Sequence, residues 1–306
     1  MAEMIDVARS SVQTWQADQM GHMNVQFYMD HATQGLAALG VYLGLGPRYI
    51  DAERARLFAR DHHVRFLREQ RPGAPFTIRA GVIGATDFGL RVYMEMSNTV
   101  SGEVAATFTA DVELMDEDTH EAKPLTLRAK KAVKAIAVEL PAYAAPRGLE
   151  IYEPRTPPTL KEAEAMKLFF TWQGEVQASQ CDGQGFLVTR HFMGIVSDSI
   201  PNLLGQTRGD DRSQNSKVGG AALEYRFHYH RFPRVGDVLT LRSGLKEVGP
   251  KTYTWCHWLF DLETGNAVGT AEAVAIALDL EARKAIPIPD EMRERLEKLV
   301  VSGLSV

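Results

Sequence analysis

The stretch Asp18-Gln-Met-Gly21-His22-Met-Asn24-Val25-Gln-Phe-Tyr28 decides how the first part of this chain folds. A β-prone run at residues 5–15 precedes it. Behind it, apolar side chains recur at nearly helical spacing, at Tyr28, Ala32, Leu36 and Leu39. We therefore expect a helix to begin close to Asn24, with Asp18 in a strand-to-helix loop that Gly21 allows to turn tightly.

A carboxylate just ahead of a helix start suits chemistry at a carbonyl group. The first N–H groups of a helix have no partner within it and form a positive pole that can hold a developing oxyanion. A carboxylate nearby can attack the carbonyl carbon or activate a water that does so. In the alternative, Asp18 only caps the helix and Tyr28 only packs. Asp18 lies rather far ahead of Asn24 for simple capping.

The pattern Asp-x-x-Gly-His-x-Asn-x-x-x-Tyr, after a strand and before a long helix, resembles hotdog-fold acyl-CoA thioesterases of the 4-hydroxybenzoyl-CoA thioesterase type. The resemblance implies hydrolysis of an acyl-CoA to a free acid and CoA, with no cofactor and no metal. It implies that Asp18 is nucleophile or general base, and that N–H groups around Asn24 and Val25 hold the oxyanion. Substrate contacts are expected from Gly21, His22, Met23, Tyr28 and, on the strand bordering the cleft, His63.

Composition fits an ordinary globular protein: 306 residues, 45% hydrophobic and 24% charged. The net charge of −5 argues against a nucleic-acid partner. No apolar run approaches membrane-spanning length, so no membrane partner is expected. The N-terminus lacks the features of a signal peptide, and the two cysteines are too few for a disulfide framework. A cytoplasmic location is the default expectation.

Strand-like runs follow the first helix, at residues 63–69, 76–83, 90–96 and 104–115. Gly44 and Gly46-Pro47 predict an irregular connection before them. Residues 127–140 predict a closing helix, and residues 141–158 are dense in proline, as in a linker. One strand, one long helix and an antiparallel meander give an α+β unit in which the helix covers one sheet face.

The second half of the chain repeats this order. The separation is 182 − 18 = 164 between aspartates, 185 − 21 = 164 between glycines, and 265 − 102 = 163 between turn glycines. A nearly constant offset predicts a duplicated unit. We therefore expect an α+β fold of two tandem hotdog modules, residues 1–140 and 161–306, joined by a linker at 141–160. By analogy with paired single hotdogs, their sheets should join edge to edge, which would cover exposed strand edges.

The two copies differ around the aspartate. The polar residues His22, Asn24 and Tyr28 correspond to the apolar residues Phe186, Val188 and Phe192. The second copy keeps the turn and a carboxylate but loses hydrogen-bonding capacity. We expect the first module to be catalytic and the second to complete the cleft, with activity at Asp182 left open.

Three alternatives remain at this point. A non-catalytic acyl-CoA sensor would share the fold, although pure binding needs no carboxylate facing the thioester. A hydratase or dehydratase needs an acid/base Asp–His pair, but His22 precedes the helix and His31 lies too far along it. His228 and His230 share a strand face without a third ligand at a diagnostic spacing, so no metal site is expected. Association of double-hotdog chains into a homo-oligomer stays open.

Overall fold

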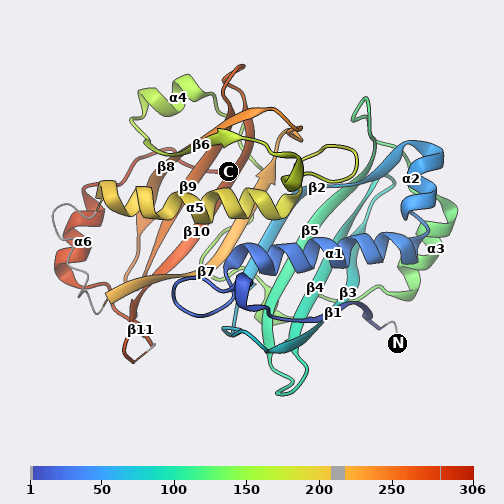
Figure 1. Ribbon diagram of the computed structural model, residues 1–306, viewed down its shortest axis with the longest axis horizontal. Coiled ribbons are helices and arrows are strands. Elements are labelled where there is room, and N and C mark those ends of the chain that lie inside the picture. Colours follow the sequence, from blue (N-terminus) through green and yellow to red (C-terminus); the bar gives the residue numbers. More distant parts are fainter. Residues whose placement is uncertain (1–2, 208–217, 283) are drawn as a thin grey trace. The chain divides into compact units, whose positions relative to one another are not determined.

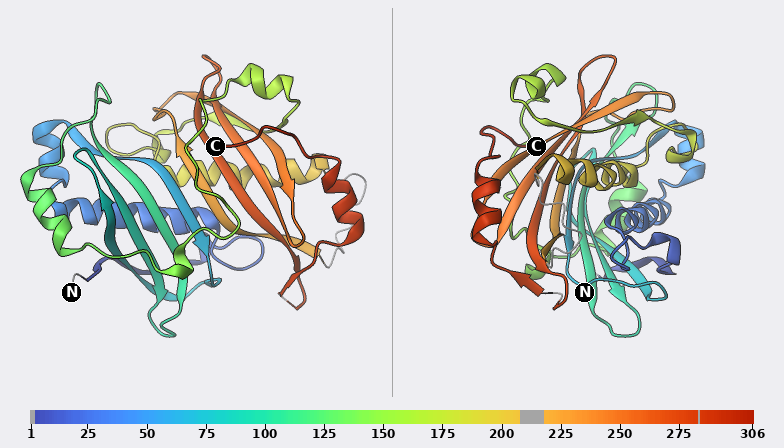
Figure 2. Two further views of the ribbon diagram at one scale, coloured as in Figure 1. Left: turned by 180° about the vertical axis from the view of Figure 1, so that it is seen from behind. Right: turned by 60° about the vertical axis from the view of Figure 1, so that its left-hand side comes forward.

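The computed structural model describes residues 3–207, 218–282 and 284–306. The chain divides into two compact units, Met1–Ala145 and Pro146–Val306. Each unit consists of one long helix lying across one face of an antiparallel sheet (Figures 1 and 2). The expected hotdog fold is therefore confirmed for both halves. Edge-to-edge joining of the two sheets stays a prediction.

The first unit has a five-stranded antiparallel sheet in the order β1-β3-β4-β5-β2. The strands are β1 (Ile5–Ser11), β2 (Ala55–Phe66), β3 (Pro75–Ala85), β4 (Gly89–Asn98) and β5 (Val104–Asp116). Helix α1 (Val25–Leu43) covers one face of this sheet (Figure 1). The shorter helices are η1 (Thr14–Gln16), α2 (Pro47–Glu53), α3 (Leu127–Ala135) and η2 (Ala142–Ala144).

Helix α1 begins and ends at residues suited to each end. The Asn24 side chain accepts the Gln26 N–H at 3.0 Å, which caps the first turn. Gly44 adopts the left-handed conformation, with φ of 80°, and closes the last turn. Gly35 lets the helix approach the sheet, because a Cβ there would lie 3.1 Å from the Val7 side chain. The buried side of α1 includes Tyr28, Met29, Ala32, Leu39 and Leu43.

The second unit repeats the arrangement, with strand order β7-β10-β9-β8-β6 and a short β11 paired to β10. The strands are β6 (Phe169–Glu175), β7 (Val218–Tyr229), β8 (Val238–Val248), β9 (Thr252–Asp261), β10 (Ala267–Asp279) and β11 (Lys284–Ile286). Helix α5 (Thr189–Thr207) covers its sheet. The remaining helices are η3 (Ala178–Gln180), α4 (Leu160–Ala165) and α6 (Asp290–Glu297).

Backbone hydrogen bonds recur at the offset found in the sequence. In the first unit the Gly102 N–H bonds to the Asn98 carbonyl at 2.9 Å, and in the second the Gly265 N–H bonds to the Asp261 carbonyl at 2.9 Å. Both glycines have φ of 72°. Helices α3 and α6 also correspond, because 290 − 127 = 163. The duplication thus extends to the closing helix, which the sequence had not indicated in the second half.

The structure corrects the expectations at three places in the first unit. Strand β2 covers Ala55–Phe66, whereas a strand was expected at residues 63–69. The segment expected to be irregular after Gly46 forms helix α2, with Pro47 in its first turn, where a missing N–H costs nothing. The helix expected over residues 127–140 ends at Ala135. There the chain joins the sheet instead, since the Val82 N–H bonds to the Ile136 carbonyl at 2.9 Å.

Within the described residues, no helix combines the length and apolar character needed to cross a membrane.

Two buried histidines should make the protein less stable in acid. Burial lowers the pKa of His62 to about 4 and that of His257 to about 3. An unfolded histidine has a pKa near 6.5, so the unfolded state takes up protons first as the pH falls. Stability should therefore decline from about pH 6.5 towards pH 4, by a few kcal/mol at most for each histidine.

Denaturant unfolding at pH 7 and pH 4.5 measures this loss. The matched variant is His257→Met, because Met94 occupies the corresponding place in the first unit. The difference in unfolding free energy between the two pH values should shrink in this variant. An unchanged difference would show that His257 does not contribute to acid sensitivity.

Candidate active site

The Asp18 loop is a tight turn closed by its own backbone. The Asp18 N–H bonds to the His22 carbonyl at 2.9 Å, and the Gly21 N–H bonds to the Asp18 carbonyl at 3.0 Å. Gly21 has φ of 77°, which favours glycine. One carboxylate oxygen of Asp18 accepts the Met20 N–H at 2.8 Å. Asp18 therefore caps its own turn and not the helix, which Asn24 caps.

His22 lies between two carboxylates. Its Nδ1 is 3.2 Å from Asp18 Oδ2, and its Nε2 is 3.7 Å from Glu69 Oε1. The side chains of His22 and Asp18 are partly exposed, so solvent or a ligand can reach them. A carboxylate, an imidazole and a second carboxylate in sequence can orient one another and relay a proton. Sequence reasoning missed Glu69 because it follows β2, remote from the motif and without a motif of its own.

Tyr28 attaches the end of β2 to helix α1. Its buried hydroxyl accepts the Gln70 N–H at 3.1 Å and donates to the Arg68 carbonyl at 3.4 Å. Burial raises the pKa of the Tyr28 phenol, so it stays protonated and able to donate. The Met23 N–H bonds to the Gln70 carbonyl at 2.7 Å. These bonds fix Glu69, between Arg68 and Gln70, beside the Asp18 loop.

The helix start offers fewer oxyanion donors than expected. The Asn24 N–H already donates to the Gln16 carbonyl at 2.9 Å, so it is not available for an oxyanion. The Gln26 N–H is used by the Asn24 side chain. The Val25 N–H makes no hydrogen bond to any residue that the structure describes. Of the two expected backbone donors, only Val25 remains a candidate.

Two of the residues expected to contact substrate, Met23 and His63, are buried. Met23 is 2% exposed and packs in the interior. His63 is 3% exposed, and strand alternation places it on the opposite sheet face from Phe66. Phe66 contacts the Tyr28 ring, with ring centroids 5.2 Å apart. His63 therefore lies on the sheet face away from α1, and its contact with the substrate stays a prediction.

Large apolar side chains flank Asp18 at the surface. Trp15 is 73% exposed and Met20 is 38% exposed. Trp15 belongs to η1, whose turn is fixed by paired side-chain bonds between Gln13 and Gln16. Ser179 takes the place of Trp15 in the second unit. An exposed apolar group on a fixed turn can contact an apolar ligand beside the carboxylate.

The second unit has the same loop backbone with different side chains. The Asp182 N–H bonds to the Phe186 carbonyl at 2.9 Å, as Asp18 does to His22. Phe186, in place of His22, packs under the Arg234 guanidinium at 4.1 Å. One carboxylate oxygen of Asp182 accepts the Gln184 and Phe186 N–H groups at 2.9 and 3.1 Å.

The loss of polar groups in the second unit is coordinated. Phe192 replaces Tyr28 and so lacks the hydroxyl, while Pro233 replaces Gln70 and so lacks the N–H that the hydroxyl accepts. Phe232 replaces Glu69. Each polar partner is absent together with the group it would have bonded. The Asp182 loop therefore retains its turn but not the arrangement of acid, imidazole and acid.

The two histidines at the end of β7 do not form a metal site among the described residues. His228 and His230 lie with ring centroids 4.8 Å apart, and the His230 Nε2 is 3.2 Å from the Thr270 hydroxyl. No group of three or more His, Cys, Asp or Glu residues within the described ranges is arranged to hold a metal ion. The histidine pair thus lacks a third ligand there.

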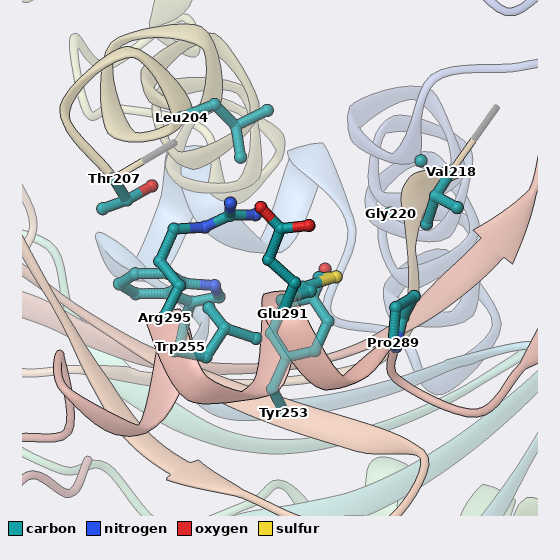
Figure 3. A pocket seen from close by; sticks show the side chains of 12 residues that line it. Leu204, Thr207, Val218, Gly220, Tyr253, Trp255, Pro289, Glu291 and Arg295 are labelled. Atoms are coloured by element: carbon teal, nitrogen blue, oxygen red, sulfur yellow. The ribbon is translucent and has the colours of Figure 1, made fainter. Parts of the chain in front are cut away.

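A cavity of about 200 Å³ lies in the second unit between the end of α5 and α6 (Figure 3). Trp255 and Tyr253 form its floor, and Arg295 and Glu291 extend from α6 towards Leu204. Helix α5 has 19 residues, so the cavity lies roughly 28 Å along it from the Asp182 loop. It is therefore separate from that loop, and its lining has no histidine beside a carboxylate.

Comparison with known proteins agrees with the duplicated fold. A family model described as "Thioesterase-like superfamily" matches residues 12–136 and again residues 176–296. No curated protein matches the chain.

Solved structures resemble the chain over nearly its whole length at low sequence identity. A putative oleoyl thioesterase from Lactobacillus plantarum aligns with a TM-score of 0.68 and 12% identity, over 90% of this chain and 97% of that one. The 12:0-ACP thioesterase from Umbellularia californica aligns with a TM-score of 0.67 and 11% identity, over 90% of this chain and 94% of that one. An acyl-ACP thioesterase from Bacteroides thetaiotaomicron aligns with a TM-score of 0.63 and 12% identity, over 88% of this chain and 96% of that one. At these low sequence identities, the comparisons show a similar fold only.

Proposed function

Because this chain belongs to the thioesterase-like superfamily, we propose that its first unit hydrolyses an acyl thioester, with acyl-CoA as the expected substrate. The observation that carries the proposal is His22 bridging Asp18 and Glu69 at the start of α1. The second unit has the same loop without this set, which supports a single working site in each chain. No cofactor is expected.

In the proposed reaction Asp18 acts on the thioester carbonyl. As a general base it takes a proton from water while the water oxygen bonds to the carbonyl carbon. As a nucleophile it attacks the carbonyl carbon, and the C–S bond breaks as an anhydride forms; water then hydrolyses this anhydride to the free acid and restores Asp18. In both routes the carbonyl oxygen gains negative charge, which the Val25 N–H and the positive helix start stabilise. The C–S bond then breaks, and the sulfur takes up a proton as the thiol leaves.

His22 would orient Asp18 and carry protons in this reaction. With a proton on Nδ1, it donates to Asp18 Oδ2 across the 3.2 Å contact, while Asp18 Oδ1 is held by the Met20 N–H. On the other side of the ring, Nε2 faces the Glu69 carboxylate at 3.7 Å. Asn24 contributes by capping α1, which aims the helix start at the loop. Tyr28 contributes by fixing the segment that carries Glu69.

The acyl group and its carrier are the finer part of the proposal. Exposed Trp15 and Met20 beside Asp18 favour an apolar acyl group. Two of the solved structures are named as acyl-ACP thioesterases and share the two-unit fold, so a carrier-protein thioester is the second candidate to acyl-CoA. The narrower likeness to the 4-hydroxybenzoyl-CoA type stays a prediction, as does a homo-oligomer.

The alternatives predict different use of the same residues. A hydratase would require a helix histidine facing Asp18, but His31 is buried and contacts Gln16. A sensor would bind the thioester without cleaving it. The polar set around Asp18 favours cleavage, because binding alone does not require an oriented carboxylate.

Thiol release by the purified protein tests the proposal. Acyl-CoAs of short, medium and long chain, an aryl-CoA and an acyl carrier protein thioester would each be mixed with protein and a thiol reagent. We expect release above the rate without protein for at least one thioester. Binding measured by calorimetry without any release would establish the sensor and overturn the hydrolase.

A further inference from the structure

The Asp18 loop is connected to the interior of α1 through one buried glutamine. The Gln16 amide nitrogen lies 3.2 Å from the His31 Nε2, and both side chains are 6% exposed. The Gln16 carbonyl of the main chain accepts the Asn24 N–H at 2.9 Å. Gln16 thus contacts helix α1 at its cap and again at His31, seven residues further along (31 − 24 = 7).

The hydrogen bonds around Gln16 indicate which ring nitrogen of His31 carries a proton. The Gln13 N–H donates to Gln16 Oε1 at 3.0 Å, which identifies that atom as the oxygen. The other amide atom is therefore NH₂, which can only donate. His31 Nε2 must accept from it, so the imidazole is neutral and carries its proton on Nδ1. A protonated His31 would place two donors against each other.

The second unit lacks this connection. Gln180 corresponds to Gln16 and keeps the bond in which the Gln177 N–H donates to its side chain, at 2.8 Å. Ile195 stands in place of His31 and offers no acceptor. The side-chain contact with a histidine is therefore present only in the first unit. The backbone bond at the helix start is kept in both units, because the Val188 N–H bonds to the Gln180 carbonyl at 3.1 Å.

We propose that His31 is a positioning residue that holds the Asp18 loop in register with the start of α1 through Gln16. Its imidazole does not touch the substrate. It acts by fixing Gln16, whose backbone carbonyl accepts the Asn24 N–H at the start of α1. The expected effect of His31 on turnover rests on the proposed hydrolysis. Its expected effect on the structure of the loop does not.

The decisive variant is His31→Ile, which installs the residue of the second unit. Amide hydrogen exchange followed by NMR would compare the Asn24 N–H with the Val188 N–H, which bonds to the Gln180 carbonyl at 3.1 Å. We expect exchange of Asn24 to speed up about tenfold or more while Val188 is unchanged. Turnover should fall by about tenfold or more, since small misplacements of catalytic groups are costly.

Two companion variants keep the proposal falsifiable if His31→Ile folds poorly. His31→Gln supplies a carbonyl acceptor and should restore both Asn24 protection and turnover. Gln16→Met keeps the side-chain length without the amide and should shift the His31 Nε2 resonance in ¹⁵N spectra. Ile195→Val controls for a packing change in α5. Unchanged Asn24 exchange in His31→Ile, or a His31 ring protonated on both nitrogens at pH 7, would overturn the proposal.

Should the wild-type protein release no thiol, the proposed function fails while the exchange and ¹⁵N measurements still decide the role of His31. If thiol is released but Asn24 exchange and turnover are unchanged in His31→Ile, only the positioning role fails.

Discussion

Replacing Asp18 by Asn should lower turnover by about a hundredfold or more, with substrate binding largely kept. Asparagine retains the size of the side chain and an oxygen that can accept the Met20 N–H, so the turn should survive. It cannot act as a base or form the anhydride. Removal of a group that acts only in the transition state lowers kcat and has little effect on substrate binding.

The matched control is Asp182→Asn in the second unit. Asp182 accepts the Gln184 and Phe186 N–H groups, and asparagine can still accept both. We expect nearly wild-type turnover and a stability loss of at most about 1 kcal/mol. Steady-state rates of thiol release on both variants decide the assignment. If Asp182→Asn is the inactive variant, the working site lies in the second unit.

His22→Phe should also lower turnover by about a hundredfold, because it removes the group that orients Asp18 and can move protons. Phenylalanine is the residue that the second unit carries at this position, as Phe186, so the same backbone is known to accommodate it. The loss should appear mainly in kcat. Glu69→Gln leaves His22 in place and weakens only its second contact, at 3.7 Å. A smaller loss, about tenfold, is expected there.

Unfolding measurements accompany these rates. His22 is partly exposed, so its replacement should leave the unfolding free energy within about 1 kcal/mol. A His22→Phe variant with full turnover would remove His22 from the mechanism. An equal loss in His22→Phe and Glu69→Gln would instead show that the two side chains act as a unit.

Local signals in the sequence were enough to establish the fold. The spacing from Tyr28 to Leu39 predicts the helix, which begins at Val25, next to Asn24 as expected. Gly21 and Gly185 mark two loops with the same backbone bonds, which confirms the duplication read from a constant offset. These properties depend on residues close together in the chain, through side-chain period, turn geometry and capping. Such interactions can be recognised without knowing the tertiary structure.

The composition of the candidate site was decided by tertiary structure. Glu69 reaches His22 only because β2 ends beside the loop, and Gln70 reaches Tyr28 for the same reason. His63 lies on the far face because of the register in which β2 pairs with β5, which one residue of shift would reverse. The Asn24 N–H is occupied by Gln16, which no spacing indicates. A sequence identifies groups that can donate or accept, but the folded chain determines which partner takes each one.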